Sequence, residues 1–178
     1  MYLRLFKPFL DISFTILISP ILLPIFLAVF FILLLDNKGK VFFVQMRPGF
    51  QGKPFKLFKF RTLRDTTGTD EERATPIGKF LRKTYLDELP QSINILKGEM
   101  SWVGPRPLLM EYMQIYTPQQ HQRHQVRPGI TGLAQVRESK NASLEEKIYW
   151  DLMYTENISF ALDLKILKET LKYLFLGK

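Results

Sequence analysis

The chain has 178 residues, which is enough for one domain with a buried core, and it contains no internal repeat. Its 25 lysines and arginines exceed its 17 aspartates and glutamates, so a net charge of +8 favours anionic partners: nucleic acid, an acidic lipid surface or phosphorylated small molecules. The absence of cysteine excludes disulfides, a thiolate nucleophile and a zinc–thiolate site. Any chemistry must therefore use carboxylates, hydroxyls, histidine or a metal ion.

An uncharged run rich in Ile, Leu and Phe covers residues 12–35. It is long enough to cross a hydrocarbon layer of roughly 30 Å, so the default interpretation is a helix that spans the bilayer. A secretory signal peptide fits less well, because the run is too long for one and no small-x-small cleavage site follows it.

Two features favour a helix that enters and leaves the same leaflet. Positive residues flank both ends of the run, and the positive-inside rule draws both ends to one side: Arg4 and Lys7 precede it, and Lys38, Lys40, Arg47 and Lys53 follow it. Pro20 and Pro24 each remove a helical hydrogen bond, so a break or sharp bend is expected at Ser19-Pro20, with the Ser19 hydroxyl as partner for a freed carbonyl. We therefore expect residues 1–36 to form a re-entrant anchor and residues 37–178 to form the folded domain.

Residues 41–44 and 55–60 resemble short strands, and the Pro- and Gly-bearing stretch between them resembles a hairpin turn. Alternation places Phe58 and Phe60 on one face and Lys59 and Arg61 on the other. The two cations could form a shelf for phosphate, although taken alone a solvated strand face is the simpler explanation.

Near the C-terminus, lysines share one helical face and leucines lie opposite: Lys165, Lys168, Glu169 and Lys172 against Leu167, Leu171 and Leu174. The pattern is typical of an amphipathic helix on an anionic membrane surface, and equally of a helix that packs its leucines on the core.

Two adjacent acids, Asp87 and Glu88, lie in the stretch Leu86 to Pro90. An aspartate that caps a helix, with a glutamate in the first turn and Gly98 as a left-handed C-terminal cap, explains the pair without any chemistry. The functional alternative, a metal-assisted phosphoryl site, depends on the cations nearby in sequence: Lys59, Arg61, Arg82, Lys83 and Arg106.

Two later segments hold an arginine in a stiff turn. One runs from Met100 to Pro107 and places Arg106 between two prolines; the other runs from Arg127 to Gly132. Arginines ordered in advance suit bidentate binding of oxyanions, because little rotamer freedom remains to be lost. Rigid surface turns are the alternative.

Together these segments resemble the bacterial sugar transferases, specifically the small monotopic phosphoglycosyl transferases that start glycan assembly on a polyprenyl lipid. The resemblance covers nearly the whole chain, and its most specific parts are residues 59–62, 86–91, 100–107 and 127–136. The nearest members act in N-linked glycan and lipopolysaccharide pathways. The resemblance implies a fold that is α+β and mostly helical, with a re-entrant membrane helix broken at Ser-Pro, a small β-hairpin and amphipathic interfacial helices.

The resemblance also implies a reaction. A UDP-sugar donates its sugar 1-phosphate to polyprenyl (undecaprenyl) phosphate and releases UMP, at the cytoplasmic face of the bacterial inner membrane. Asp87 would be the nucleophile and form an aspartyl phosphosugar intermediate. Glu88, together with Asp87, would hold Mg²⁺, which neutralises the diphosphate.

Further site residues follow from the same resemblance. Those expected to contact the substrates are Lys59, Arg61, Arg82, Arg106, Arg127, Gln135 and Asp163. One departure stands out: relatives commonly have Gly-Arg after the Gln-Val pair, whereas here Val136 is followed by Arg137, and Arg137 or Lys140 is left to replace that contact.

Two alternatives stay open. In the first, Asp87 acts as a general base for direct transfer without a covalent intermediate. In the second, the chain is a basic module that binds the membrane surface without chemistry. Nucleic-acid binding lacks any accompanying motif and is not expected. The identity of the sugar, the lipid length and the oligomeric state cannot be inferred from the sequence.

Overall fold

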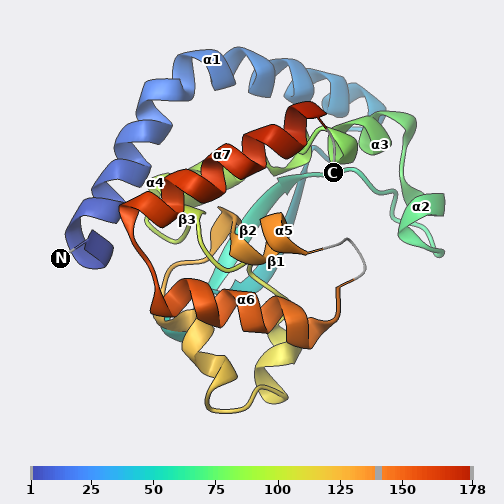
Figure 1. Ribbon diagram of the computed structural model, residues 1–178. Coiled ribbons are helices and arrows are strands. Elements are labelled where there is room, and N and C mark those ends of the chain that lie inside the picture. Colours follow the sequence, from blue (N-terminus) through green and yellow to red (C-terminus); the bar gives the residue numbers. More distant parts are fainter. Residues whose placement is uncertain (1, 139–141, 177–178) are drawn as a thin grey trace.

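The computed structural model describes residues 2–138 and 142–176, and its longest helix arches over the rest of the molecule (Figure 1). This helix, α1 (Lys7–Asp36), follows a π-helical turn, η1 (Tyr2–Phe6). It is continuous through Pro20 and Pro24. The break expected at Ser19-Pro20 is therefore not seen, and a curved helix takes its place.

The Ser19 side chain helps to explain why α1 continues through Pro20. Proline has no N–H, so Pro20 leaves the carbonyl oxygen of Ile16 without its helical donor. The Ser19 hydroxyl donates to that oxygen over 2.8 Å. The expected role of Ser19 as partner for a freed carbonyl is confirmed, and the proline bends the helix instead of ending it.

The predicted hairpin is confirmed. β1 (Phe42–Pro48) and β2 (Pro54–Phe60) pair antiparallel, with Phe42 opposite Phe60 and Pro48 opposite Pro54, and the 3-10 turn η2 (Phe50–Gly52) joins them. On one face, the Phe42 and Phe60 rings stack with centroids 5.7 Å apart, and Phe26 of α1 packs on both.

Short elements fill the centre of the chain. In order they are α2 (Asp70–Arg73), α3 (Pro76–Lys83), the 3-10 turn η3 (Leu86–Glu88), α4 (Gln91–Leu96), β3 (Ser101–Val103), the 3-10 helices η4 (Met110–Gln114) and η5 (Gln120–Gln125), and β4 (Gly129–Thr131). β3 and β4 pair parallel, which brings the two arginine-bearing turns of the sequence together. Gly104 and Gly129 are required there, because a Cβ on either would clash with the other turn.

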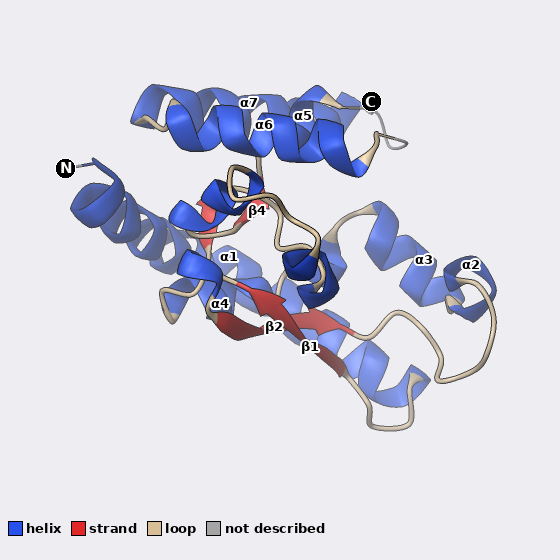
Figure 2. Cartoon of the chain, turned by 90° about the horizontal axis from the view of Figure 1, so that it is seen from below, coloured by secondary structure: helices blue, strands red, loops and turns tan. Residues whose placement is uncertain are grey.

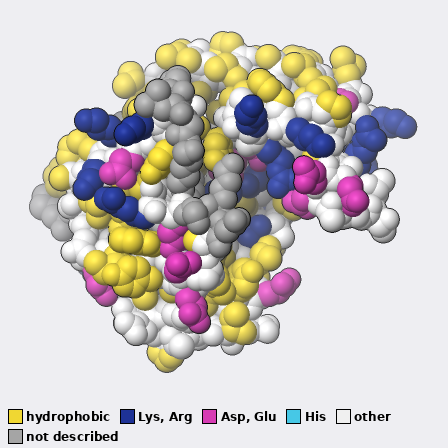
Figure 3. All heavy atoms as spheres, turned by 45° about the vertical axis from the view of Figure 1, so that its right-hand side comes forward, with side chains coloured by type: hydrophobic (Ala, Val, Ile, Leu, Met, Phe, Trp, Pro, Cys, Tyr) yellow, Lys and Arg dark blue, Asp and Glu magenta, His cyan; other side chains and the backbone are white. Residues whose placement is uncertain are grey.

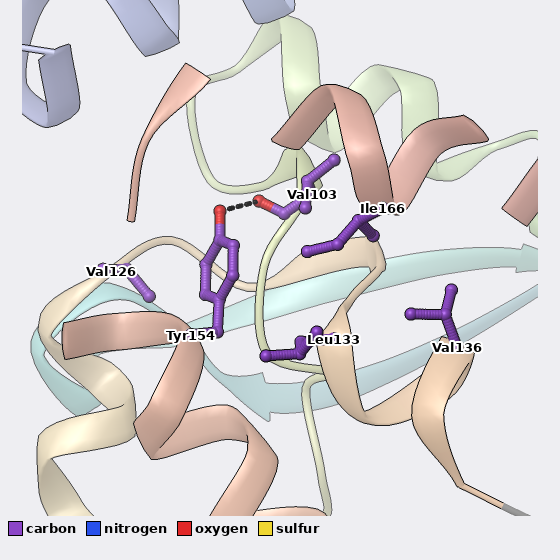
Figure 4. Packing of buried hydrophobic residues seen from close by; sticks show 6 residues of the cluster. All are labelled: Val103, Val126, Leu133, Val136, Tyr154 and Ile166. Atoms are coloured by element: carbon purple, nitrogen blue, oxygen red, sulfur yellow. Dashed lines mark hydrogen bonds between the residues drawn. The ribbon is translucent and has the colours of Figure 1, made fainter. Parts of the chain in front are cut away.

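The C-terminal part is helical: α5 (Leu133–Arg137), α6 (Leu144–Glu156) and α7 (Phe160–Leu176). Figure 2 shows these three helices on one side of the molecule and the hairpin on the other. Their core includes Val103, Val126 and Ile166, and the Tyr154 hydroxyl donates to the Val103 carbonyl over 3.1 Å (Figure 4). The mostly helical fold with one small hairpin agrees with the prediction.

Helix α1 has an inverted polarity, because its polar side chains are buried and its apolar ones exposed. Lys7, Asp11 and Thr15, one turn apart, face the domain, and each is less than a tenth exposed. Leu17, Ile21 and Leu35 are 75%, 69% and 84% exposed. Figure 3 shows hydrophobic side chains gathered along the edge of the molecule that α1 occupies. Exposed apolar surface of this extent is typical of contact with lipid, and α1 has the length and composition of a helix that could cross a membrane.

Both ends of α1 dock on the same domain. At the N-terminal end, the Lys7 ammonium contacts the Asp163 carboxylate of α7 at 2.5 Å. At the C-terminal end, Leu33 is fully buried in a cluster with Phe60 of β2 and Leu81 of α3. The arch between them carries the proline residues.

Helix α7 has features of both predicted types, a helix packed on the core and a helix on a membrane surface. Ile166 is buried and Leu167 packs against the core, as in an ordinary surface helix. Leu164, Leu171 and Leu174 are about half exposed beside the lysines. The helix therefore presents apolar and basic side chains outward together.

Candidate active site

The acidic pair lies in η3, directly after α3. Helix α3 ends at Lys83, and Tyr85 takes the left-handed conformation with φ of 59°, which turns the chain back. The Glu88 amide then donates to the Tyr85 carbonyl over 3.2 Å. Asp87 does not cap the next helix: α4 begins after Pro90 and has no side-chain cap. The capping explanation of the pair is therefore wrong. Capping does not account for the burial of the two side chains, which are 8% (Asp87) and 7% (Glu88) exposed.

Two cations from distant segments hold Glu88. The Lys59 ammonium of β2 and the Arg106 guanidinium, which follows β3, each lie 2.7 Å from Glu88 Oε1. Burial by itself raises the pKa of Glu88, but Arg106 and Lys59 outweigh it and bring the pKa below its usual range. The charge on Glu88 in turn raises the pKa of Arg106. Glu88 is therefore ionised and held in place.

Asp87 has a contrasting environment. Within residues 2–138 and 142–176, no group donates a hydrogen bond to its carboxylate. Burial and the neighbouring charge of Glu88 raise the pKa of Asp87 to about 6, although Lys59, Arg106 and Arg82 act in the opposite direction. A buried carboxylate without donors and with a raised pKa is typical of a functional group, because it costs stability.

Lys59 is placed by the contact between β2 and α4. Asn94 of α4 is fully buried, accepts a hydrogen bond from the Phe58 amide over 3.2 Å and donates to the Lys56 carbonyl over 2.7 Å. These bonds fix the edge of β2 next to η3 and so bring Lys59 to Glu88. Nothing in the sequence marked Asn94, because an isolated asparagine in a short helix carries no distinguishing pattern.

Among the other predicted site residues, Arg82 acts on the pair. Its charge lowers the pKa of Asp87, and its guanidinium lies 3.0 Å from the Asp70 carboxylate. The remaining contacts are elsewhere: Arg61 pairs with Asp65 at 2.5 Å, Arg127 donates to the Gly98 carbonyl over 2.8 Å, and Gln135 donates to the Ile130 carbonyl over 2.8 Å. These three keep their predicted roles only as predictions.

Asp163 lies where the anchor meets the domain. Its carboxylate accepts hydrogen bonds from Tyr2, Lys7 and Tyr154 over 2.6, 2.5 and 2.7 Å. These contacts give it a role in docking α1, and its expected contact with the substrates stays a prediction. Of the residues considered as replacements for the family's Gly-Arg, Arg137 lies 3.7 Å from Glu169, and Lys140 lies outside the described residues.

A polar link between α1 and β3 was not predicted from the sequence. The Trp102 amide donates to Asp11 over 3.2 Å, and the Trp102 indole donates to the Thr15 hydroxyl over 2.9 Å. The signal was present: Lys7, Asp11 and Thr15 recur every four residues and therefore share one helix face.

The two carboxylates fit a magnesium ion. In the described part of the chain, no three acidic or histidine side chains cluster as a complete metal site. Mg²⁺ usually takes one or two carboxylates and completes its shell with water and substrate phosphates, so a larger cluster is not required. Glu88 Oε1 makes both ion pairs, and among the described residues none donates to either oxygen of Asp87.

A family model described as bacterial sugar transferase matches residues 2–177. The chain belongs to the bacterial sugar transferase family. The uncharacterized sugar transferase EpsL of Bacillus subtilis (strain 168) is 53% identical over 138 residues, which cover 74% of this chain and 68% of that protein.

Other relatives of this sugar transferase carry more informative names. The UDP-glucose:undecaprenyl-phosphate glucose-1-phosphate transferase of Klebsiella pneumoniae is 43% identical over 179 residues, 92% of this chain but only 38% of that protein. The exopolysaccharide production protein PSS of Rhizobium leguminosarum bv. phaseoli is 38% identical over 185 residues, 92% of this chain and 90% of that protein. The chain thus matches a part of some relatives and nearly the whole of others.

Proposed function

We propose that this bacterial sugar transferase moves a sugar 1-phosphate from a UDP-sugar to undecaprenyl phosphate and releases UMP. The names of relatives such as the Klebsiella enzyme supply the substrate classes. The observation that carries the proposal for this chain is the asymmetry of the acidic pair: Lys59 and Arg106 hold Glu88, while none of the described residues donates to Asp87.

Asp87 attacks in the first displacement. A carboxylate oxygen forms a bond to the phosphorus on the sugar side of the diphosphate, the bond from that phosphorus to the bridging oxygen breaks, and UMP leaves with the electron pair. In the second displacement a phosphate oxygen of the lipid attacks the same phosphorus. The acyl phosphate bond breaks, and the Asp87 carboxylate is regenerated.

The surrounding residues have separate parts in these steps. Lys59 and Arg106 fix Glu88 beside the reacting carboxylate and offset the charge of the diphosphate. Asp87 and Glu88 would hold Mg²⁺, which supplies charge neutralisation for the leaving UMP. The half-exposed Arg106 is also placed to meet a phosphate oxygen that approaches from solvent.

The location follows from α1. Because both of its ends dock on one domain, we propose that the arch enters one leaflet from the cytoplasmic face and returns, so that lipid phosphate and the acidic pair meet at the interface. The exposed leucines and lysines of α7 add a second lipid-facing surface. The name of the Rhizobium relative favours exopolysaccharide as the glycan, with this transfer as its first membrane step.

The decisive experiment incubates the protein with a panel of UDP-sugars and Mg²⁺ in the absence of acceptor. Mass spectrometry should find a sugar phosphate on Asp87 with one donor and none on the Asp87→Asn variant, which should have lost turnover. Turnover without any adduct would favour direct transfer with Asp87 as a base. No turnover with any donor, together with full membrane binding by Asp87→Ser, would favour the binding module.

A further inference from the structure

The turn that carries Arg106 is tied down by its carbonyl groups. Three successive carbonyl oxygens each accept a hydrogen bond from a different part of the chain. Pro105 accepts from the Gly129 amide over 3.0 Å, Arg106 from Arg123 Nη2 over 2.8 Å, and Pro107 from Arg47 Nη1 over 3.3 Å.

The sequence of the turn explains why it is held through its carbonyl groups. Pro105 and Pro107 have no N–H, so Arg106 has the single main-chain donor of the three residues. The turn therefore cannot be held through its own amides as a strand or helix is. Two of the three donors it uses instead are arginine side chains, from β1 and η5.

The Arg123 side chain is buried where it makes this contact. Its side chain is 1% exposed, although arginine is seldom fully buried. Its Nε and Nη2 lie 3.1 and 2.5 Å from Asp151 Oδ2 in α6, and its guanidinium lies 5.8 Å from the centre of the Tyr116 ring. Asp151 and the Arg106 carbonyl thus share one fixed guanidinium. Removing either charge of such a pair would leave the other buried and unpaired.

Arg47 approaches the same turn from the hairpin. It is half-buried, and its Nη2 also donates to Gln45 Oε1 over 2.6 Å, so its fork is oriented from within β1. The turn is therefore clamped between the hairpin and the C-terminal helices. Arg106 extends from this clamp to Glu88, 2.7 Å away.

We propose that Arg123, oriented by Asp151, and Arg47 are positioning residues that hold the main chain of the Pro105–Pro107 turn so that the Arg106 guanidinium stays on Glu88. They touch no substrate and act only through Arg106. The expected effects on kinetics rest on the proposed function. The expected effects on the position of the turn do not.

The test compares conservative variants of both arginines in the full chain. A lysine keeps the charge but cannot bond Asp151 and the Arg106 carbonyl through one planar fork. Arg123→Lys and Arg47→Lys should therefore fold but lose about 10- to 100-fold in kcat/KM, as is usual for residues that support the side chains of a site. The double variant Arg123→Met/Asp151→Leu removes the buried pair without stranding a charge and should behave similarly. Arg73→Lys is the matched control, because Arg73 also donates to a main-chain carbonyl, that of Arg64, and should keep full activity.

Two readouts separate positioning from general loss of structure. The loss of kcat/KM caused by Arg123→Lys or Arg47→Lys should largely disappear in an Arg106→Gln background, because both arginines act through Arg106. Hydrogen exchange at the Gly129 amide, which donates to the Pro105 carbonyl, should accelerate, while exchange in α6 and β2 stays as in the wild type.

Unchanged exchange at the Gly129 amide, or activity losses that simply add to that of Arg106→Gln, would overturn the inference. If the wild-type protein transfers no sugar phosphate, the proposed function fails by itself. The exchange measurement then still decides whether the two arginines hold the turn.

Discussion

Asp87 and Glu88 are neighbours in the chain but have opposite surroundings. Glu88 receives two cations and has a lowered pKa, whereas Asp87 receives no hydrogen bond from the described residues and has a raised pKa. The sequence predicted that the pair would be functional and surrounded by cations. It could not assign which acid the cations bind, because that depends on where β2 and the turn after β3 meet in space.

The raised pKa of Asp87 predicts the pH dependence of activity. A nucleophilic carboxylate must be ionised, so kcat/KM should rise with pH through about 6 and level off above it. Arg106→Gln removes a cation that lowers this pKa, and the rise should then occur at higher pH. Initial rates from pH 5 to 8 in three-component buffers check this, and a profile flat across pH 6 would contradict it.

The ionised form of Asp87 should also lower the free energy of unfolding. Its folded pKa exceeds the unfolded value of 3.8, so the protonated carboxyl is favoured in the folded state, and this contribution is lost as the pH rises through about 6. At pH 8 we expect Asp87→Asn to be more stable than the wild type by up to about 3 kcal/mol, from a shift of roughly two pKa units. Near pH 4 the difference should almost vanish.

Thermal unfolding of the detergent-solubilised protein at both pH values measures this difference. Asp65→Asn serves as the control, since Lys40 and Arg61 lower the pKa of that exposed carboxylate and its loss should not stabilise the fold. An Asp87→Asn variant that unfolds at lower temperature than the wild type at pH 8 would speak against the buried, donor-free environment.

At the level of secondary structure, the hairpin and α4 together place Lys59 next to Glu88. Alternation and the turn residues predicted the hairpin, and the prediction held because both are local signals. The docking of α4 on β2 through Asn94 was not predictable, because it joins residues 36 and 38 positions apart.

Asn94→Ala should cost about 1–3 kcal/mol, since it leaves the partly buried Phe58 amide and Lys56 carbonyl of β2 without their side-chain partner. We expect lower activity as well, because Lys59 loses its fixed position. Urea unfolding followed by Trp fluorescence checks the first effect. Ser92→Ala, which removes a local hydroxyl bond to the Leu89 carbonyl in the same helix, is the control and should change stability by under about 1 kcal/mol.

For the whole molecule, the arch of α1 is the basis of the proposed membrane topology. The Lys7–Asp163 pair and the cluster around Leu33 hold its two ends on one domain. A helix crossing the bilayer would have to release one of these contacts. We therefore propose insertion into one leaflet, with the exposed apolar middle of α1 in lipid.

The cysteine-free sequence allows a direct test of this topology. Arg4→Cys and Lys38→Cys place single exposed thiols at the two ends of α1, and Ser19→Cys places one near its bend. In right-side-out and inverted vesicles, an impermeant maleimide should label both ends only from the cytoplasmic side and should not label position 19. Labelling of the two ends from opposite sides would establish a spanning helix instead.

Local patterns in the sequence were sufficient for the apolar anchor, the hairpin, the acidic pair and the segments that mark a bacterial sugar transferase, because each depends on residue type and short spacing. Only the tertiary structure decided that Lys59 and Arg106 bind Glu88, that no described residue donates to Asp87, and that Arg123 is buried behind Arg106. These outcomes depend on which distant groups are packed together, since burial and neighbouring charge set the pKa of a carboxylate and the partners of an arginine.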